Sequence, residues 1–432
     1  MKNFQLIMIV VFMAAAILGI LAFAGLIPLG GNSNNEKLQG SLVLWGTVKF
    51  DQVSSALEDF NRANPDLIIK YVQKYPETFD RDLLEAFANG NGPDLFLIPD
   101  DLAYHYSNKI FTIPFQTYPL VNFKNNFVGA GNVFLNSKGV TALPIMVDPL
   151  VMYYNVSMFE SNNIIYPPSD WEALLGMVDK LNKKDETGKL LKSAVALGHF
   201  SNVSHAKEIL SALIMQAGNP IVQEKNGGYI STLGNKIGKY DLDSTLGFYT
   251  NFADPLNGAY SWNKSFPNSI DAFSSEKLAI YFGFASELSV IADKNPNLNF
   301  MVAPIPQIKN SDSKITFGRT TGLAISSFSK NFDNAYIVAN TLANGNFASK
   351  LSSLSKVVPA RKNLLQAPAE NPYSQIFYNS ALFAKNWMDP SPDDTSKIFQ
   401  SMTEAVLSNL MNTQEALINA NGKINLLLVP KQ

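Results

Sequence analysis

SLVLWG at 41–46, LIIKYV at 67–72 and DLFLI at 94–98 are short apolar runs of the kind that form buried β-strands. The segments between them, 50–63 and 79–89, carry apolar residues at helical spacing, and each is followed by residues that end a helix. The order strand, helix, strand, helix, strand predicts a doubly wound α/β layer with parallel strands.

Polar and aromatic residues stand at the carboxyl ends of the first and third strands. In doubly wound layers, ligands bind beyond these ends. Trp45 and Thr47 end the first strand, and Asp101 follows the third, so we expect these three residues at a ligand site. The alternatives are a core role for Trp45 and helix capping by Asp101, although Asp100 is expected to be the more exposed capping residue.

Two further extended runs, 141–148 and 150–155, follow each other almost directly. They predict strands that pass from one lobe into another, because a chain of 432 residues is too long for one typical domain. A strand at 299–306 is expected to leave the second lobe, and a buried strand at 322–326 is expected to return to the first. The chain is therefore expected to form two discontinuous lobes.

The crossing runs set the expected boundaries of the two lobes. Lobe one is expected at 41–148 and 305–355, and lobe two at 149–304 and 356–432. The polar stretch 30–40, which is rich in glycine and asparagine, is expected to be a linker in front of lobe one.

The segment 4–29 is almost entirely apolar and carries no charge. At roughly 1.5 Å per residue it is long enough to cross a hydrocarbon core of roughly 30 Å. We expect a single transmembrane anchor, and Lys2 held inside places the body on the extracytoplasmic side. The alternative is a cleaved signal peptide, because AFA at 22–24 resembles a cleavage site.

The composition excludes several classes of protein. The net charge of -2 lacks the basic excess of a nucleic-acid binder. Cysteine is absent, so the chain has neither disulfides nor the lipid-modified cysteine of a lipoprotein. His105, His199 and His205 are scattered without metal-ligand spacing, so we expect no metal and no cofactor.

Nine segments together resemble one family when they are taken in chain order. They are 42–45, 92–96, 143–148, 154–159, 167–172, 277–283, 303–306, 322–326 and 358–361. The family is the extracellular solute-binding proteins of ABC importers, of the large carbohydrate type. The resemblance implies a two-lobed periplasmic-binding-protein-like fold with crossing hinge strands, which closes on a ligand and delivers it to a permease. The tryptophan that many members carry after the glycine of 277–283 is absent here.

Further candidate site residues lie in both lobes. Asp148, between the crossing runs, is expected to accept a hydrogen bond from the ligand or to hold the hinge. Thr321 precedes the return strand of lobe one and could close over a ligand. Phe200 follows an apolar run, and Trp262 lies in a polar loop, so either aromatic face could stack on a sugar.

The turn after Gly283 supplies the remaining candidates. Phe284, Ser286 and Glu287 follow this glycine at the end of a predicted strand, and we expect them on the lobe-two wall of the cleft. Asp148 is expected to lie at the hinge end, between this wall and the wall formed by Trp45 and Asp101.

Two functions are compatible with these residues. The first is non-catalytic capture of a small solute, a sugar or oligosaccharide, by a monomer that passes it to ABC permease subunits. The alternative is a membrane-anchored extracytoplasmic enzyme that processes glycans, which needs paired carboxylates such as Asp101 and Glu287. The sequence has no GxSxG turn, no P-loop and no GxGxxG motif, so we favour the binding protein.

The anchor interpretation predicts that residues 4–29 stay attached to the mature protein. Cleavage after Ala24 would leave the apolar residues Leu26, Ile27 and Leu29 at the new N-terminus. Intact-mass measurement of the protein from the membrane fraction should therefore give the full-length chain. A mature chain that begins at Gly25 or later would show that the segment is a signal peptide.

Overall fold

A computed structural model describes residues 38–429 apart from 236, 312 and 370. The predicted anchor at 4–29 lies outside the described residues. Within the described part of the chain, no helix combines the length and the apolar character needed to cross a membrane.

The elements of the first part of the chain are β1 (Gly40–Gly46), α2 (Phe50–Ala63), β2 (Leu67–Gln73), α3 (Pro76–Ala88), β3 (Leu95–Pro99), β4 (Ile113–Pro114), α4 (Leu120–Asn126), β5 (Leu135–Asn136), β6 (Gly139–Val140) and β7 (Ala142–Asn155). The middle part contains α5 (Val156–Glu160), α6 (Trp171–Leu175), α7 (Val178–Leu181), β8 (Lys183–Lys184), β9 (Leu190–Val195), α8 (Ala206–Gln216), β10 (Val222–Lys225), β11 (Gly228–Ser231), α9 (Leu242–Asn251), α10 (Ser269–Ser274), β12 (Leu278–Phe284), α11 (Leu288–Lys294) and β13 (Phe300–Pro304). The last part contains β14 (Thr316–Ile325), α12 (Phe332–Asn344), α13 (Asn346–Leu354), β15 (Val358–Pro359), α14 (Pro372–Leu382), β16 (Ala384–Lys385), α15 (Pro392–Leu407) and α16 (Thr413–Leu427).

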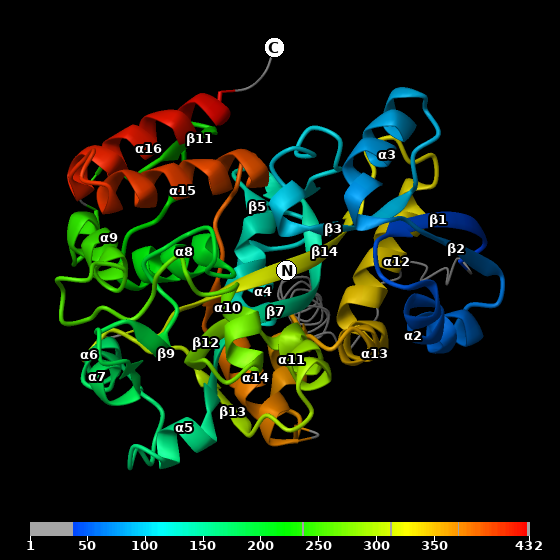
Figure 1. Cartoon of the computed structure of the whole chain (residues 1–432). Coiled ribbons are helices and arrows are strands. Elements are labelled where there is room, and N and C mark those ends of the chain that lie inside the picture. The colour runs from blue at the N-terminus through cyan, green and yellow to red at the C-terminus, as the bar shows by residue number, and fades with distance from the viewer. Residues whose placement is uncertain (1–37, 236, 312, 370, 430–432) are drawn as a thin grey trace, which may run out of the picture.

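One sheet runs through the molecule in the order β2-β1-β3-β14-β7-β12-β9-β8. β1 pairs in parallel with both β2 and β3, as the sequence predicts for a doubly wound layer. β14 lies between β3 and β7 and is antiparallel to both, so it borders the parallel strands on the side of β3. The helices α2, α12 and α13 lie on the lobe-one side of the molecule, and α8, α9, α15 and α16 lie on the lobe-two side (Figure 1).

The two lobes are joined by long continuous strands. The runs 141–148 and 150–155, expected as two strands, form the single 14-residue strand β7. Its first half pairs with β14 and β15, whereas its second half pairs with β12 and β13. β14 also extends past lobe one, since Thr316 and Phe317 pair with β16. Figure 1 shows β7 and β14 between the two bodies of the molecule.

Each lobe has a buried apolar cluster of its own. Leu323 of β14 lies in one cluster with Leu44 and Leu95. Val151 of β7 lies in another with Phe282 of β12. α13 packs on α2, whereas α16 packs on α9 and α15. Ile305, Ile315 and Phe317 also lie in the second cluster, so the boundaries expected from the sequence stay a proposal.

Two helix starts have clear local causes. α3 begins at Pro76, ahead of the predicted start at 79, because proline at the first helical position loses no hydrogen bond there. α6 is capped by Asp170, whose carboxylate accepts a hydrogen bond of 2.8 Å from the Ala173 amide. The Ser169 hydroxyl donates to that carboxylate at 3.1 Å.

The burial of Leu323 predicts a large effect of truncation. This side chain is 1% exposed, so Leu323→Ala should lower the free energy of unfolding by about 2–5 kcal/mol. Ile68→Ala is the matched control, because Ile68 is 65% exposed on the same sheet and should change stability by less than about 0.5 kcal/mol. Urea unfolding of both variants measures the difference. Equal losses for the two variants would contradict the packing described here.

Candidate functional site

A cleft of about 1170 Å³ lies where the two lobes meet. Lobe one contributes residues that follow β1 and β3, and lobe two contributes the start of α8 and the segment between β16 and α15. β7 and β14 supply its floor, and register pairs Asp148 of β7 with Arg319 of β14. The cleft therefore lies at the carboxyl ends of parallel strands, the position that the doubly wound layer predicts.

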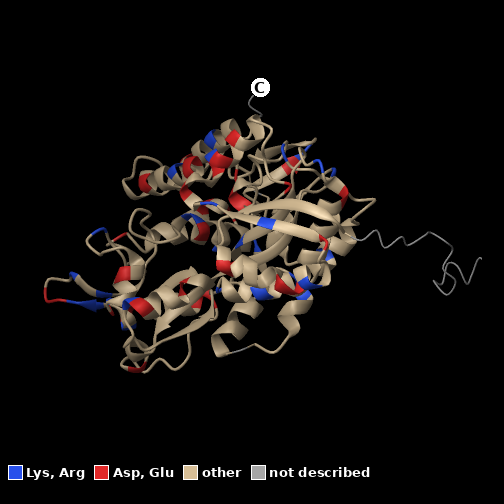
Figure 2. Ribbon diagram, turned by 90° about the vertical axis from the view of Figure 1, so that its right-hand side faces the viewer, with Lys and Arg blue, Asp and Glu red and all other residues tan. Residues whose placement is uncertain are grey.

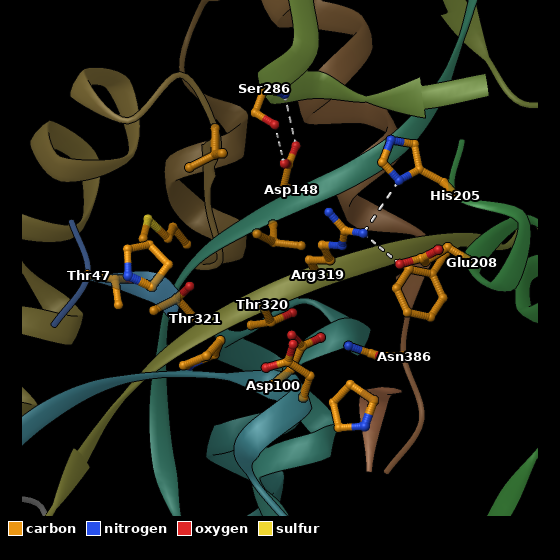
Figure 3. A pocket seen from close by; sticks show the side chains of 18 of the residues that line it. Thr47, Asp100, Asp148, His205, Glu208, Ser286, Arg319, Thr320, Thr321 and Asn386 are labelled. Carbon is orange, nitrogen blue, oxygen red and sulfur yellow. Dashed lines mark hydrogen bonds and ion pairs between the residues drawn. The ribbon is translucent and has the colours of Figure 1, made fainter. Parts of the chain in front are cut away.

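Six of the ten residues predicted for the site line this cleft. They are Thr47, Asp101, Asp148, Phe200, Ser286 and Thr321. Figure 3 shows Thr47 and Thr321 on one side of the cavity and Ser286 above Asp148. The structure thus brings together residues that are far apart in the sequence and come from both lobes.

Trp45 and Trp262 do not line the cleft. Trp45 packs against the apolar cluster beneath β3, and the Lys74 ammonium lies 3.9 Å from the centroid of its ring. Trp262 is completely buried, stacks on Phe266 at a centroid distance of 4.6 Å and donates its indole hydrogen to Asn202. The expectation that these aromatic faces meet a ligand is corrected to a packing role for both.

Phe284 and Glu287 lie behind the cleft wall. Phe284 is 1% exposed, with the Arg319 guanidinium 4.0 Å from its ring centroid. Glu287 accepts hydrogen bonds from the Tyr281 hydroxyl at 2.9 Å and from the Phe284 amide at 3.0 Å. Gly283 permits this arrangement, because a side chain there would collide with the Glu287 carboxylate. Neither residue is among those that line the cleft, and both were expected on its lobe-two wall.

Asp148 links the crossing strand to lobe two. Its two carboxylate oxygens accept hydrogen bonds from the Ser286 amide at 3.0 Å and from the Ser286 hydroxyl at 2.6 Å. Burial raises the pKa of Asp148 to about 6, although these hydrogen bonds and the nearby Arg319 charge oppose the rise. Asp148 therefore ties β7 to the segment after β12 and also lines the cleft, so both of its expected roles stay predictions.

Arg319 forms the centre of a charged network in the cleft. It donates to Glu208 at 2.6 Å and to Nδ1 of His205 at 3.4 Å (Figure 3). Because Nδ1 accepts this bond, Nε2 of His205 carries the hydrogen and donates it to the Glu287 carboxylate, with 2.8 Å between Nε2 and Oε1. Burial is the largest single influence and opposes ionisation of Glu208, but the charge and hydrogen bond of Arg319, together with other nearby positive charge, outweigh it and lower the pKa of that carboxyl.

His205 has an uncommon backbone conformation. Its φ of 59° is left-handed, and it immediately precedes α8. Such a conformation costs a residue other than glycine roughly 1–2 kcal/mol. The bond to Glu287 and the edge-on contact with the Phe284 ring, at 4.8 Å between centroids, offset this cost. The strain directs the imidazole toward Arg319.

Lys207 and Asp389 form a second ion pair at the cleft, which sequence reasoning missed. The Lys207 ammonium lies 2.9 Å from the Asp389 carboxylate and also donates to the Pro392 carbonyl at 3.2 Å. The two side chains are only 14% and 9% exposed. No local motif marks this pair, because the residues are far apart in the sequence and meet only when α15 packs near α8.

Asp100 and Asn386 are further cleft residues that were not predicted for the site. The expectation that Asp100 is the more exposed of the two aspartates is wrong, since Asp100 is 7% exposed whereas Asp101 is exposed. The chain turns into a short 3₁₀ helix (Asp100–Leu102) directly after β3, which buries the first carboxyl. Burial and the adjacent Asp101 carboxylate raise the pKa of Asp100.

The arrangement supports hydrogen bonding more than catalysis. The carboxylate pair that a glycan-processing enzyme would need, Asp101 with Glu287, does not face one space, because Glu287 is held behind the wall by its own partners. Among the described residues, no cluster of three or more possible ligands could hold a metal ion. The cleft offers carboxylates, hydroxyls, an amide and a guanidinium, which suit a polar solute.

Comparison with known proteins identifies the family. Residues 48–344 match the family described as bacterial extracellular solute-binding protein, and this chain belongs to it. It is a family of binding proteins and not of enzymes. A Brucella abortus (strain 2308) protein that is described as a binding protein is 21% identical over 357 residues, which cover 80% of this chain and 81% of that protein.

Solved structures show the same two-lobed fold. The cyclo/maltodextrin-binding protein complexed with maltotetraose is 18% identical, with a TM-score of 0.72 and coverage of 91% of this chain and 98% of that one. The cyclic alpha-maltosyl-1,6-maltose binding protein from Arthrobacter globiformis is 14% identical, with a TM-score of 0.74 and coverage of 90% and 99%. The α/β fold with two lobes, expected from the sequence, is confirmed.

The raised pKa of Asp148 predicts a dependence of stability on pH. The folded protein binds this proton more tightly than the unfolded chain, so the Asp148 contribution to stability falls as pH rises from about 4 through about 6. Asp148→Asn should lack this fall in stability. The free energy of unfolding of the variant, relative to that of the wild type, should therefore change by at most about 3 kcal/mol over this pH range.

Chemical denaturation between pH 4 and pH 8 measures this difference. Asp293→Asn is the control, because Asp293 is an exposed residue of α11 outside the cleft, and its profile should follow that of the wild type. A constant difference between the wild type and Asp148→Asn over this range would contradict the pKa assigned to Asp148.

Proposed function

We propose that this protein captures a carbohydrate-like solute in the cleft between its lobes and delivers it to the permease of an ABC importer. The observation that carries the proposal is the cleft itself, which has a volume of about 1170 Å³ and polar side chains from both lobes. Ligand pockets of drug-sized molecules measure about 300–1,000 Å³, so a cleft of this size suits an oligosaccharide.

The proteins with the same fold support this class of ligand. One of them is complexed with maltotetraose, and another is named for binding a cyclic maltosyl sugar. We propose that the sugar hydroxyls exchange hydrogen bonds with the polar residues predicted from the sequence and found at the cleft, and that the Phe200 ring contacts an apolar sugar face. These polar residues are Thr47, Asp101, Asp148, Ser286 and Thr321.

Closure of the lobes is the proposed source of affinity. β7 and β14 are the strands that join the two lobes beside the cleft, so a change of angle there would bring the two walls together. Asp148 would hold the lobe-two wall through Ser286 during this movement.

Delivery to a permease requires the protein to stay at the outer face of the membrane. We propose that residues 4–29 anchor it there as a single span, with residues 38–429 in the extracytoplasmic space and acting as a monomer. On the face shown in Figure 2, Lys and Arg are interspersed with Asp and Glu. Together with the net charge of -2, this mixed surface agrees with a small solute as the partner and not with a nucleic acid.

A pair of variants tests the assignment of the cleft once a sugar is bound. Asn386 lines the cleft with its amide group, so Asn386→Ala should weaken binding about 2- to 10-fold through the loss of one hydrogen bond. Trp45→Ala should leave affinity unchanged but lower thermal stability, because Trp45 packs beneath the cleft wall. Calorimetric titration beside thermal melts of full-length protein measures both effects.

The panel for this test contains maltose, maltotetraose, a cyclic maltodextrin, cello- and chito-oligosaccharides and a set of peptides. A bound sugar should raise the melting temperature, because it stabilises only the native state. Stabilisation by peptides and not by sugars would contradict the proposed ligand class. Loss of sugar binding in Trp45→Ala with normal stability would contradict the location of the site.

A further inference from the structure

The cleft contains more acidic than basic side chains. Its acidic residues are Asp100, Asp101, Asp148, Glu208, Asp389 and Asp393, and its basic residues, apart from His205, are Lys49, Lys207, Arg319 and Lys356. Lys49 and Lys356 are exposed residues on the lobe-one side, beside α2 and α13. Of the four cations, Lys207 and Arg319 are the ones whose charges act on Asp100 and Asp101.

Both of these interior cations are already neutralised. Lys207 is 2.9 Å from Asp389, and its remaining hydrogens are directed at the Pro392 carbonyl and, at 3.4 Å, at the Thr395 hydroxyl. Arg319 is 2.6 Å from Glu208. Each cation thus has its direct ion pair with another carboxylate, and it acts on Asp100 or Asp101 only from a greater distance.

Asp100 and Asp101 remain without a cationic partner. Among the described residues, neither carboxyl takes part in a salt bridge, although the Thr320 amide donates a hydrogen bond to Asp100. Asp100 is only 7% exposed, and Figure 3 shows its carboxyl facing the cavity beside the Asn386 amide. Burial, followed by the charge of Asp389, raises the pKa of Asp101. Two adjacent carboxyls thus line the cleft without a direct ion pair, and the charges of Arg319 and Lys207 compensate them only in part, since the pKa of each stays raised.

Aromatic surface in the same cleft is scarce. Phe317 and Trp387 line it but are only 6% exposed each, and the Trp387 ring is stacked on Phe399 and donates to Ser211. Phe200 is the more accessible aromatic residue of the lining. Stacking on neutral sugar rings therefore contributes less here than the charged hydrogen-bonding groups do.

We propose that the solute is an amino sugar, or an oligosaccharide that contains one, and that its protonated amino group binds between Asp100 and Asp101. This inference rests on the proposed function and narrows its ligand class. A ligand ammonium supplies the positive charge that the interior of the cleft lacks, and it offers three donors to acceptors that are already in place. The neutral part of the ligand occupies the cleft toward Thr47 and Thr321.

The test compares ligands that differ only in charge. Full-length protein in a non-ionic detergent is titrated at pH 7 with glucosamine oligomers of two to four units and with their N-acetylated counterparts, beside maltotetraose. The amino form should bind at least about tenfold more tightly than the acetylated form, and its affinity should fall as salt is added. Calorimetry in two buffers of different ionisation enthalpy should also detect proton release on binding, because the ammonium lowers the pKa of the two carboxyls.

Two variants locate the contact. Asp101→Asn and Asp100→Asn keep the shape of the side chain but remove the charge, and each should reduce the preference for the amino form to less than about threefold. Asp333→Asn, an exposed position of α12 outside the cleft, is the matched control and should keep the full preference. Thermal melts confirm that the variants are folded.

The outcomes separate this inference from the proposed function. If the acetylated or neutral sugars bind as tightly as the amino form, the amino-sugar inference is overturned while the proposed function stands. If no sugar of either kind binds, both are overturned. An unchanged preference in both aspartate variants would also overturn the inference, because the ammonium would then bind elsewhere.

Discussion

The rest of the structure depends on the antiparallel pairing of β7 with β14. Both strands belong to the central sheet, and β7 extends without a break into lobe two, where its second half pairs with β12. Their register alone places Asp148 opposite Arg319 at the floor of the cleft. A slip of β7 by one residue would turn Asp148 to the other face of the sheet, away from Arg319, so the geometry of the site and the junction of the lobes have the same origin.

The carboxylates around this floor differ in how fully their charge is compensated. The ion pairs Arg319 with Glu208 and Lys207 with Asp389 have short contacts, and the second pair is largely buried, so its contact compensates for the cost of burial. Asp148 is held by the two groups of Ser286. Compensation decreases toward lobe one, where Asp100 has only backbone donors. The polar groups of the lobe-two wall are therefore held by contacts within the protein, whereas the lobe-one wall has a carboxyl group that can bind a ligand.

Much of the fold could be predicted from the sequence, because its local patterns agree with its tertiary contacts. The helix predicted at 50–63 has those bounds in the structure, since a clear apolar face and Asn64-Pro65 define it. Failures came where a side chain is turned by distant contacts. Glu287 stands at a strand end, but Tyr281 and His205 hold it away from the cleft. Trp262 lies in a polar stretch, yet Asn202 gives its indole a buried partner. The spacing of residues along the sequence does not indicate these partners, because the contacts form only in the folded protein.

The late position of β14 in the chain affects how the protein is made. β3 pairs with β1 on one side, but its other edge stays open until residues 316–325 have left the ribosome. An open strand edge with apolar neighbours is a template for pairing with other chains. Lobe one therefore cannot complete its sheet until β14 is present, and a chain that lacks residues 316–325 leaves this edge of β3 open to such pairing.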